Sequence, residues 1–468
     1  MVKILRFNLK KKGMVSSMPL NIDHYKDYFT RSFQKTDDLF DERLQHFTHF
    51  ADAGFPTPQC ERWRTTNLKS LIAHLPFDQK ETVSPLTKEA LPAPLLANAY
   101  RLVLIDGAFA PSLSDNLSAE GITLRDLSSE LNPKDLMISP FYMDHYKPSD
   151  LSFIRLNRAL CQTGFHLNVP AEVTVSKPIE IVCLTTKGDQ QYHPQIKVTL
   201  GENSDLTILE RHESLDPGAL YFANYAISIE VSTKATLRHY QLQNQSNKAF
   251  HIENMKADLQ EDSHYQQFIL TTGSSLARQE IQALLCGKKA DVHISGAYLI
   301  NDTQLSDVTS FIEHQAEQTK SRQVYKGVIA GSARGVFQGK IYVDSIAQKT
   351  DGYQLNRALL LSETAQINSK PELEIYADDV KCSHGATSGY LNDDALFYLQ
   401  SRGIPESEAK KMLITAFLEE SLQEITHDET RAAFSKHIEQ TLQQLSPLVN
   451  PAFPLRQGFG RQVAEMTK

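Results

Sequence analysis

The 468-residue sequence predicts a mainly β core with helical regions at both ends. Between about residues 166 and 389, apolar and polar residues alternate as they do in strands. A small–x–apolar triplet after a polar turn begins at Ser204, Ala235, Ser263 and Ala290, at intervals of 31, 28 and 27 residues, and resumes near Ala365. This loose period favours a stacked β-solenoid, in which each coil buries its apolar face against neighbouring coils, over a β-sandwich.

Residues 1–17 are basic, contain no acidic residue and lack the long apolar centre of a signal peptide. We expect residues 1–17 to be a disordered tail, or to result from a translation start assigned upstream of a true start at Met18. An organelle transit peptide is the remaining alternative for this stretch.

Residues 18–160 are predicted to form an N-terminal helical and mixed region. Phe40, Leu44 and Phe47 recur at helical spacing within a helix predicted over 37–53, which Gly54 ends. A short strand is expected at 102–105, and the rest of this region carries no clear pattern.

The last predicted strands lead into the helical C-terminus. Leu373 and Ile375 alternate toward the core, and continued alternation would place Cys382 and His384 together on the opposite face, with Cα atoms roughly 6.5–7 Å apart. Thiolate sulfur and imidazole nitrogen suit iron, copper or zinc. Two donors are only half a site, and the alternative is that Cys382 fills space while His384 lies on the surface.

Three other histidines lie on or beside strand patterns, His212, His239 and His251. None belongs to a ligand motif, so we expect them to have structural roles.

Residues 390–468 are predicted to form a C-terminal helical domain. A short helix over 392–400 ends at Gly403, a second begins at Pro405, and a third covers 428–445. The apolar face predicted for the second helix consists of Ala409, Met412, Leu413, Ala416 and Phe417.

The composition argues against several classes of function. The net charge of −8, from 48 Lys+Arg and 56 Asp+Glu, argues against a nucleic-acid-binding surface. Five scattered cysteines without a C-x-x-C motif provide neither a disulfide framework nor a self-contained cluster site, and indicate a reducing compartment. No apolar run approaches the roughly 20 residues of a membrane helix. We therefore expect a cytoplasmic protein.

Four segments closely resemble the SufD family of scaffold subunits of the SUF iron–sulfur cluster assembly machinery. These are Ser321 to Val343, Ala347 to Ser362, Lys370 to Gly389 and Phe397 to Ile404. The resemblance implies a right-handed parallel β-helix for the core, assigned here to residues 161–389.

The resemblance also implies a function. Family members are non-catalytic scaffolds that pair with SufB as a heterodimer and recruit the SufC ATPase, and the isolated subunit could form a homodimer. They hold no stable cofactor alone, and iron or an iron–sulfur cluster passes transiently through the partner interface. In the family, the histidine that corresponds to His384 belongs to the assembly site, with Cys382 second. Tyr398, Arg402 and Gly403 lie in the segment that matches where SufC docks.

Two alternatives remain open. A SufB-type scaffold has a similar core but typically carries H-E-A where this chain has His384-Gly385-Ala386. A stand-alone carbohydrate-active solenoid enzyme would need carboxylates gathered in a groove. The candidates for that role are Glu372, Glu374, Asp378 and Asp379.

Overall fold

The computed structural model describes residues 22–75 and 86–444, which divide into two compact units. The smaller unit contains the described residues of Met1–Phe77 together with Asn132–Cys161. The larger unit contains those of Asp78–Leu131 and Gln162–Lys468. The tail predicted over residues 1–17 lies outside the described residues.

The smaller unit is helical and packs around aromatic side chains. Its helices are α1 (Ile22–Ser32), α2 (Phe40–Ala53), η1 (Glu61–Trp63), α3 (Lys69–His74), α5 (Pro133–Leu136), α6 (Pro140–His145), η5 (Pro148–Leu151) and α7 (Ser152–Leu160). The Tyr25 and Phe50 rings meet edge to face at 5.7 Å between centroids, and Trp63 lies 5.2 Å from Phe153. Helix α2 begins three residues later than predicted, because the chain first turns before Phe40, and it ends at Gly54 with φ of +67°.

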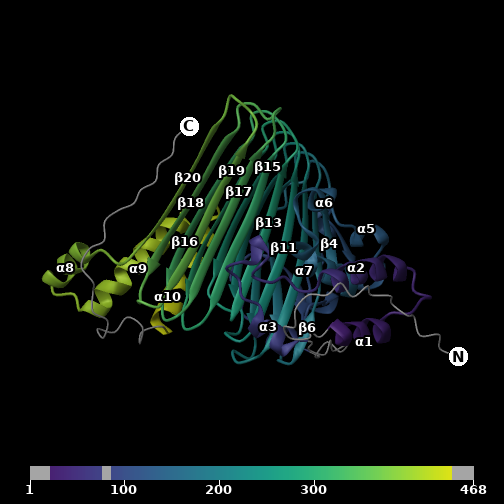
Figure 1. Ribbon diagram of the computed structural model, residues 1–468, viewed down its shortest axis with the longest axis horizontal. Helices are drawn as coiled ribbons and strands as arrows, with labels where there is room; N and C mark the ends of the chain where they lie inside the picture. Colours follow the sequence, from purple (N-terminus) through teal and green to yellow (C-terminus); the bar gives the residue numbers. More distant parts are fainter. Residues whose placement is uncertain (1–21, 76–85, 445–468) are drawn as a thin grey trace. The chain divides into compact units, whose positions relative to one another are not determined.

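The larger unit begins with short elements and continues into two sheets (Figure 1). The short elements outside the sheets are η2 (Lys88–Ala90), η3 (Pro111–Leu113), η4 (Ser118–Glu120) and α4 (Leu127–Glu130). Sheet I contains, in order, β2 (Ala108–Phe109), β1 (Tyr100–Ile105), β5 (Ile179–Thr185), β8 (Asp205–Ser214), β10 (Thr236–Asn244), β12 (His264–Thr271), β14 (Asp291–Ile300), β16 (Lys320–Ile329), β18 (Asp351–Leu360) and β20 (Lys381–Gly389).

Sheet II contains, in order, β19 (Gln366–Ile375), β17 (Arg334–Val343), β15 (Leu305–His314), β13 (Leu276–Leu285), β11 (Phe250–Leu259), β9 (Tyr221–Val231), β7 (Gln195–Leu200), β4 (Gly164–Val169) and β3 (Thr123–Asp126), and β6 (Gln190–Tyr192) pairs with β9. From β7 onward the chain alternates between the sheets and each strand pairs in parallel with the next one of its own sheet, as from β10 to β12. The predicted parallel solenoid is therefore confirmed. The first sheet also recruits β1, from the segment that sequence alone assigned to the N-terminal region, by parallel pairing with β5.

The repeat seen in the sequence is one coil of the solenoid. Ser204, Ala235, Ser263 and Ala290 each precede a strand of sheet I, and all four are buried. The residues that follow them are aligned across the sheet, from Asp205 through Thr236 and His264 to Asp291. The triplet at Ala365 instead precedes β19 of sheet II, so it marks the other corner of the coil.

A left-handed residue forms each corner before these strands. Asn203, Lys234, Asp262 and Lys289 have φ between +55° and +61°. Their backbone N–H groups donate to the next coil, for example from Lys234 to the carbonyl of Glu261 at 2.9 Å. The hydrogen-bond ladder thus continues through the corner.

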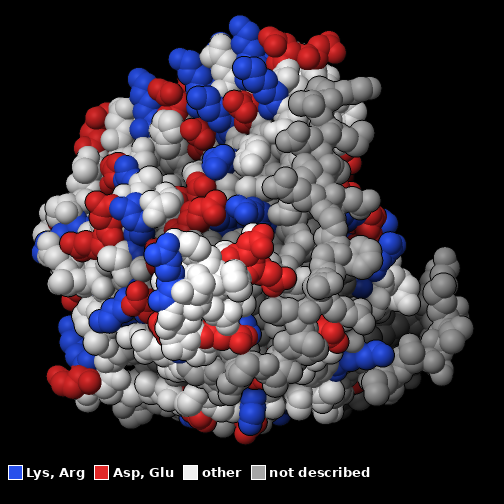
Figure 2. Space-filling view, turned by 90° about the vertical axis from the view of Figure 1, so that its left-hand side faces the viewer, with Lys and Arg blue, Asp and Glu red and all other residues white. Residues whose placement is uncertain are grey.

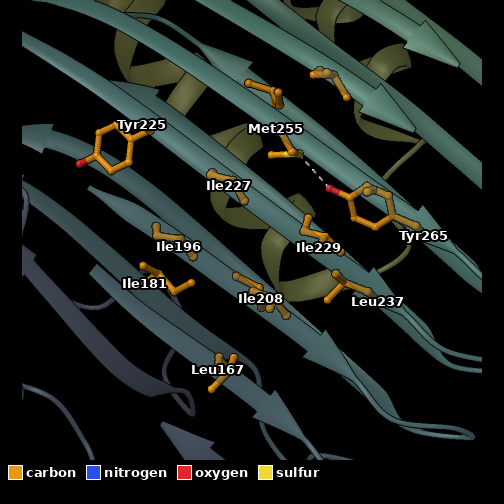
Figure 3. Packing of buried hydrophobic residues seen from close by; sticks show 14 of the residues in the cluster. Leu167, Ile181, Ile196, Ile208, Tyr225, Ile227, Ile229, Leu237, Met255 and Tyr265 are labelled. Carbon is orange, nitrogen blue, oxygen red and sulfur yellow. Dashed lines mark hydrogen bonds between the residues drawn. The ribbon is translucent and has the colours of Figure 1, made fainter. Parts of the chain in front are cut away.

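Apolar side chains from both sheets fill part of the interior. Figure 3 shows Ile181, Ile208 and Leu237 of sheet I together with Ile227 and Ile229 of sheet II. These side chains are at most 2 % exposed. Because side chains alternate along a strand, the intervening residues point outward, and the outer face of sheet I needs its own cover.

The three C-terminal helices are α8 (Asp393–Ser401), α9 (Glu406–Leu422) and α10 (Asp428–Gln444). Helices α9 and α10 provide that cover. Leu418 of α9 and Phe434 and Ile438 of α10 are fully buried in one cluster with Phe268 and Leu299 on the outer face of sheet I.

The buried face of α9 agrees only in part with the predicted one, since Ala409 is fully buried and Phe417 packs against the buried cluster. Ile414, Leu418 and Leu422 are buried, whereas Met412 is 43 % exposed and Ala416 is exposed. Apolar residues surround much of this helix, so helical spacing alone could not identify the side that faces the sheet. Among the described residues, no helix is long and apolar enough to cross a membrane.

An ion-pair cluster also anchors the end of α9. The Glu424 carboxylate lies 2.8 Å from His293 Nε2 and 3.2 Å from the Arg322 guanidinium. Burial alone would raise the pKa of Glu424, but these two partners outweigh it and hold the pKa at about 2. The carboxylate therefore contributes stability above its unfolded pKa of roughly 4.3, and this contribution is lost as pH falls through about 2.

We predict that Glu424→Gln weakens the attachment of α9 at neutral pH. Removal of one charged partner from a half-buried cluster costs about 1–3 kcal/mol. Hydrogen exchange of α9 amides should become faster in the variant, and its difference from wild type should shrink near pH 2. Glu439→Gln, at an exposed position of α10, is the control. An equal effect at both pH values would show that charge pairing is not the cause.

Candidate functional site

The solenoid ends at two open strands. β20 is the last strand of sheet I and β19 the last of sheet II, and no other strand of the described residues pairs with their outer edges. Figure 1 shows β20 at this end, next to β18. Open strand edges expose N–H and C=O groups that can pair with another chain.

His384 lies on β20 with one unsatisfied nitrogen. Its Cα pairs with Gln354 of β18, and the side chain is partly buried. Its Nδ1 is buried and accepts or donates no hydrogen bond among the described residues. A buried imidazole nitrogen without a partner is available to a water molecule, a proton donor or a metal ion.

Cys382 faces the core, contrary to the sequence prediction. It is 8 % exposed and packs with Ile341, Val343 and Ala377. The prediction placed it opposite Leu373, but both residues belong to this one cluster, because the chain turns a corner between β19 and β20 and the alternation does not continue through it.

This environment does not activate the Cys382 thiol. Burial raises its pKa, which favours the neutral thiol over the thiolate that binds metals. Cys382 and His384 still share one face of β20, as expected two residues apart on a strand. In the described part of the chain, no third Cys, His, Asp or Glu joins this pair in a group that could hold an ion.

The predicted partner-binding residues gather at helix α8. Tyr398 is 57 % exposed, and the Arg402 guanidinium lies over its ring at 5.1 Å from the centroid. Gly403 ends the helix with φ of +85°, where a side chain would be strained. Phe397, which sequence reasoning did not single out, is 71 % exposed beside Tyr398.

The surface around α8 and β20 carries mixed charge. Figure 2 shows this side of the molecule, where basic and acidic side chains are interspersed. Glu374 pairs with Lys340 at 2.8 Å and Glu372 with Lys370 at 3.1 Å. Carboxylates neutralised by lysines form a solvated charged face rather than a catalytic carboxylate pair.

A second group of chemistry-bearing side chains lies inside the solenoid. Glu210 hydrogen-bonds His212 Nε2 at 2.7 Å and His239 Nε2 at 2.8 Å, and all three side chains are buried. Burial would raise the pKa of Glu210, but these hydrogen bonds outweigh it and hold the pKa below its usual value. Burial also raises the pKa of the neighbouring Cys183 thiol and lowers the pKa of His251.

Sequence reasoning treated His212, His239 and His251 as separate structural residues. A usable signal was present, because Glu210 and His239 are 29 residues apart, which is one coil of the solenoid. Residues one coil apart lie side by side on neighbouring strands, so the period brings them together.

Comparisons with known proteins match most of the chain to one protein family. Residues 183–417 match the model for the SUF system FeS cluster assembly SufBD core domain, and residues 21–181 match the SufBD protein N-terminal region. The chain is 31% identical to the iron-sulfur cluster assembly protein SufD of Escherichia coli over 389 residues, covering 82% of this chain and 88% of that protein.

Two further similar proteins also carry names of iron-sulfur cluster assembly proteins. Identity is 31% to an iron-sulfur cluster assembly SufBD family protein of Synechocystis, covering 79% of this chain and 84% of that protein. Identity is 25% to SufD of Bacillus subtilis, covering 86% of this chain and 94% of that protein.

Proposed function

Because this chain belongs to the SufBD family of the SUF iron–sulfur cluster assembly system, we propose that it is a SufD-type scaffold subunit that pairs with SufB and recruits the SufC ATPase. The observation that carries the proposal is the open strand β20, which bears His384 with an unpartnered imidazole nitrogen. A partner strand along this edge would bring its own side chains next to His384.

In this proposal the chain is a non-catalytic cytoplasmic subunit. Iron or a nascent cluster is cargo at the interface with SufB, where His384 provides one donor and SufB the others. Cys382 supports the local packing, since its buried thiol is not activated. ATP hydrolysis belongs to SufC, and α8 with Phe397, Tyr398 and Arg402 is the surface that recruits it.

The SufD assignment is favoured over a SufB-type scaffold by Gly385. This residue follows His384 where SufB proteins typically carry glutamate. The position is partly buried, and a Cβ there would lie 3.2 Å from the Leu355 side chain. This strand therefore carries no carboxylate ligand beside His384.

We predict that the isolated chain, purified without oxygen, holds no stable iron–sulfur cluster. A cluster needs about four protein ligands, and among the described residues neither His384 nor Cys382 belongs to a group of three or more Cys, His, Asp or Glu that could hold a metal ion. Reconstitution with iron and sulfide should give a cluster absorption spectrum only when SufB and SufC are co-purified with the chain.

The matched variant is Cys382→Ser in the isolated chain. A cluster that is stable in the lone wild-type protein and lost in this variant would contradict the proposal. So would failure of the chain to co-purify with SufB and SufC when all three are expressed together.

A further inference from the structure

The buried polar group inside the solenoid lies far from His384. Its residues come from β5, β8 and β11, and five strands of sheet I separate β8 from β20. At about 4.8 Å between neighbouring strands, six steps place them roughly 29 Å apart. The group is therefore separate from the site proposed for cluster assembly.

Strand register brings three potential metal ligands together. Cys183 of β5 pairs with His212 of β8, and Glu210 points the same way as His212 because it lies two residues earlier on the strand. The Cys183 sulfur, a Glu210 carboxylate oxygen and a His212 ring nitrogen all lie within 4.8 Å of one another. All three side chains are buried.

The opposite sheet contributes a fourth donor. The His251 ring of β11 lies 4.9 Å from the His212 ring, and its side chain is fully buried. His251 Nδ1 and His212 Nδ1 have no hydrogen-bond partner among the described residues, whereas His251 Nε2 lies 3.5 Å from a Glu253 carboxylate oxygen. Buried imidazole nitrogens without a partner are costly unless a further atom binds them.

The buried carboxylates of this group are paired with histidines. The ion-pair partners of the buried Glu210 and Glu253 are histidines in the described structure, namely His212, His239 and His251. A divalent cation bound beside Glu210 would compensate the buried carboxylate.

We propose that Cys183, Glu210, His212 and His251 bind one divalent first-row transition-metal ion, Zn²⁺ or Fe²⁺, inside the solenoid. Sulfur, nitrogen and oxygen donors in one set are typical of these ions and unsuited to Mg²⁺ or Ca²⁺. Binding releases the Cys183 thiol proton to solvent, and no electron transfer is involved. The proposal stands independently of the cluster-assembly function.

The distances between Cys183, Glu210 and His212 are compatible with three positions of a tetrahedral site after a contraction, and His251 has to move toward them to take the fourth. Metal–ligand bonds of about 2.0–2.3 Å place the ligand atoms of a tetrahedron roughly 3.3–3.8 Å apart. The three donors within 4.8 Å therefore need to close by at most about 1.5 Å. Coordination replaces the hydrogen bond between Glu210 and His212, while His239 keeps its own bond to Glu210 and orients it.

The test is to refold the full chain with Co²⁺, Zn²⁺ or Fe²⁺ supplied separately, because a buried site is filled most readily as the protein folds. We expect about one equivalent of metal per chain after removal of free ion. The Co²⁺ form should show thiolate-to-cobalt charge-transfer absorption, and metal should raise the thermal midpoint. Competition between Zn²⁺ and Fe²⁺ identifies the preferred ion.

Cys183→Ser should lose the charge-transfer band, and His212→Gln should lose most of the bound metal. Cys286→Ser, which removes a different thiol, is the control and should keep both signals. Wild-type protein without a thiolate–cobalt band overturns the proposal even where a variant fails to fold. Equal metal content in wild type and a folded Cys183→Ser variant overturns it as well.

Discussion

Replacing His384 with alanine is expected to stop cluster assembly while the fold is retained. His384 is partly exposed on an edge strand, so its truncation should change stability by no more than about 1 kcal/mol. Loss of a partner in the outer shell of a metal site already costs 10–100-fold in affinity or activity, so loss of a direct donor should reduce assembly at least about tenfold. The effect is measured by complementation of a strain that lacks this protein, with the activity of an iron–sulfur enzyme as the readout.

The matched control is Cys382→Ser on the same face of the same strand. Because the Cys382 thiol packs in an apolar cluster, this variant should lose some stability but retain assembly whenever the complex forms. Complex formation with SufB must be checked for both variants. Full rescue by His384→Ala in an intact complex would show that the assembly site lies elsewhere.

The second large effect is expected at helix α8. Replacing Phe397 and Tyr398 together with alanine should abolish recruitment of SufC. Exposed aromatic residues are frequent hot spots of protein interfaces, and truncation of each hot spot costs at least about 2 kcal/mol, or roughly thirtyfold in the dissociation constant. Titration of SufC onto the purified chain measures this directly.

Point variants are preferable to removal of the C-terminal helices. Leu418, Phe434 and Ile438 cover the apolar outer face of sheet I, so deletion of α9 and α10 would expose that face and cause aggregation. Ile346→Ala, at a side chain that is 65 % exposed at a corner of the solenoid, is the control for loss of an exposed apolar group. Unchanged affinity for SufC in the double variant would exclude α8 as the docking surface.

The pattern of the chain determined much of the fold. Alternation predicted strands, and the spacing of Ser204, Ala235 and Ser263 predicted coils that the structure shows in exact register from Asp205 to His264. These signals are reliable because a coil makes its main contacts with adjacent coils, so each repeat must satisfy the same local packing.

Two features differ from what the sequence pattern predicted. The corner between β19 and β20 moved Cys382 into the core, because a turn resets the phase of alternation. The buried face of α9 was decided by where the helix meets sheet I, since apolar residues occur on more than one of its sides.

The sequence by itself therefore determined the coil period and the strands, both of which depend on neighbours along the chain or one coil away. Only the tertiary structure decided that Cys183, Glu210, His212 and His251 meet in the interior. Cys183 and His212 meet through pairing within sheet I, whereas His251 reaches them from sheet II. The distance between facing sheets is set by the packing of all the interior side chains together, and no local pattern encodes it.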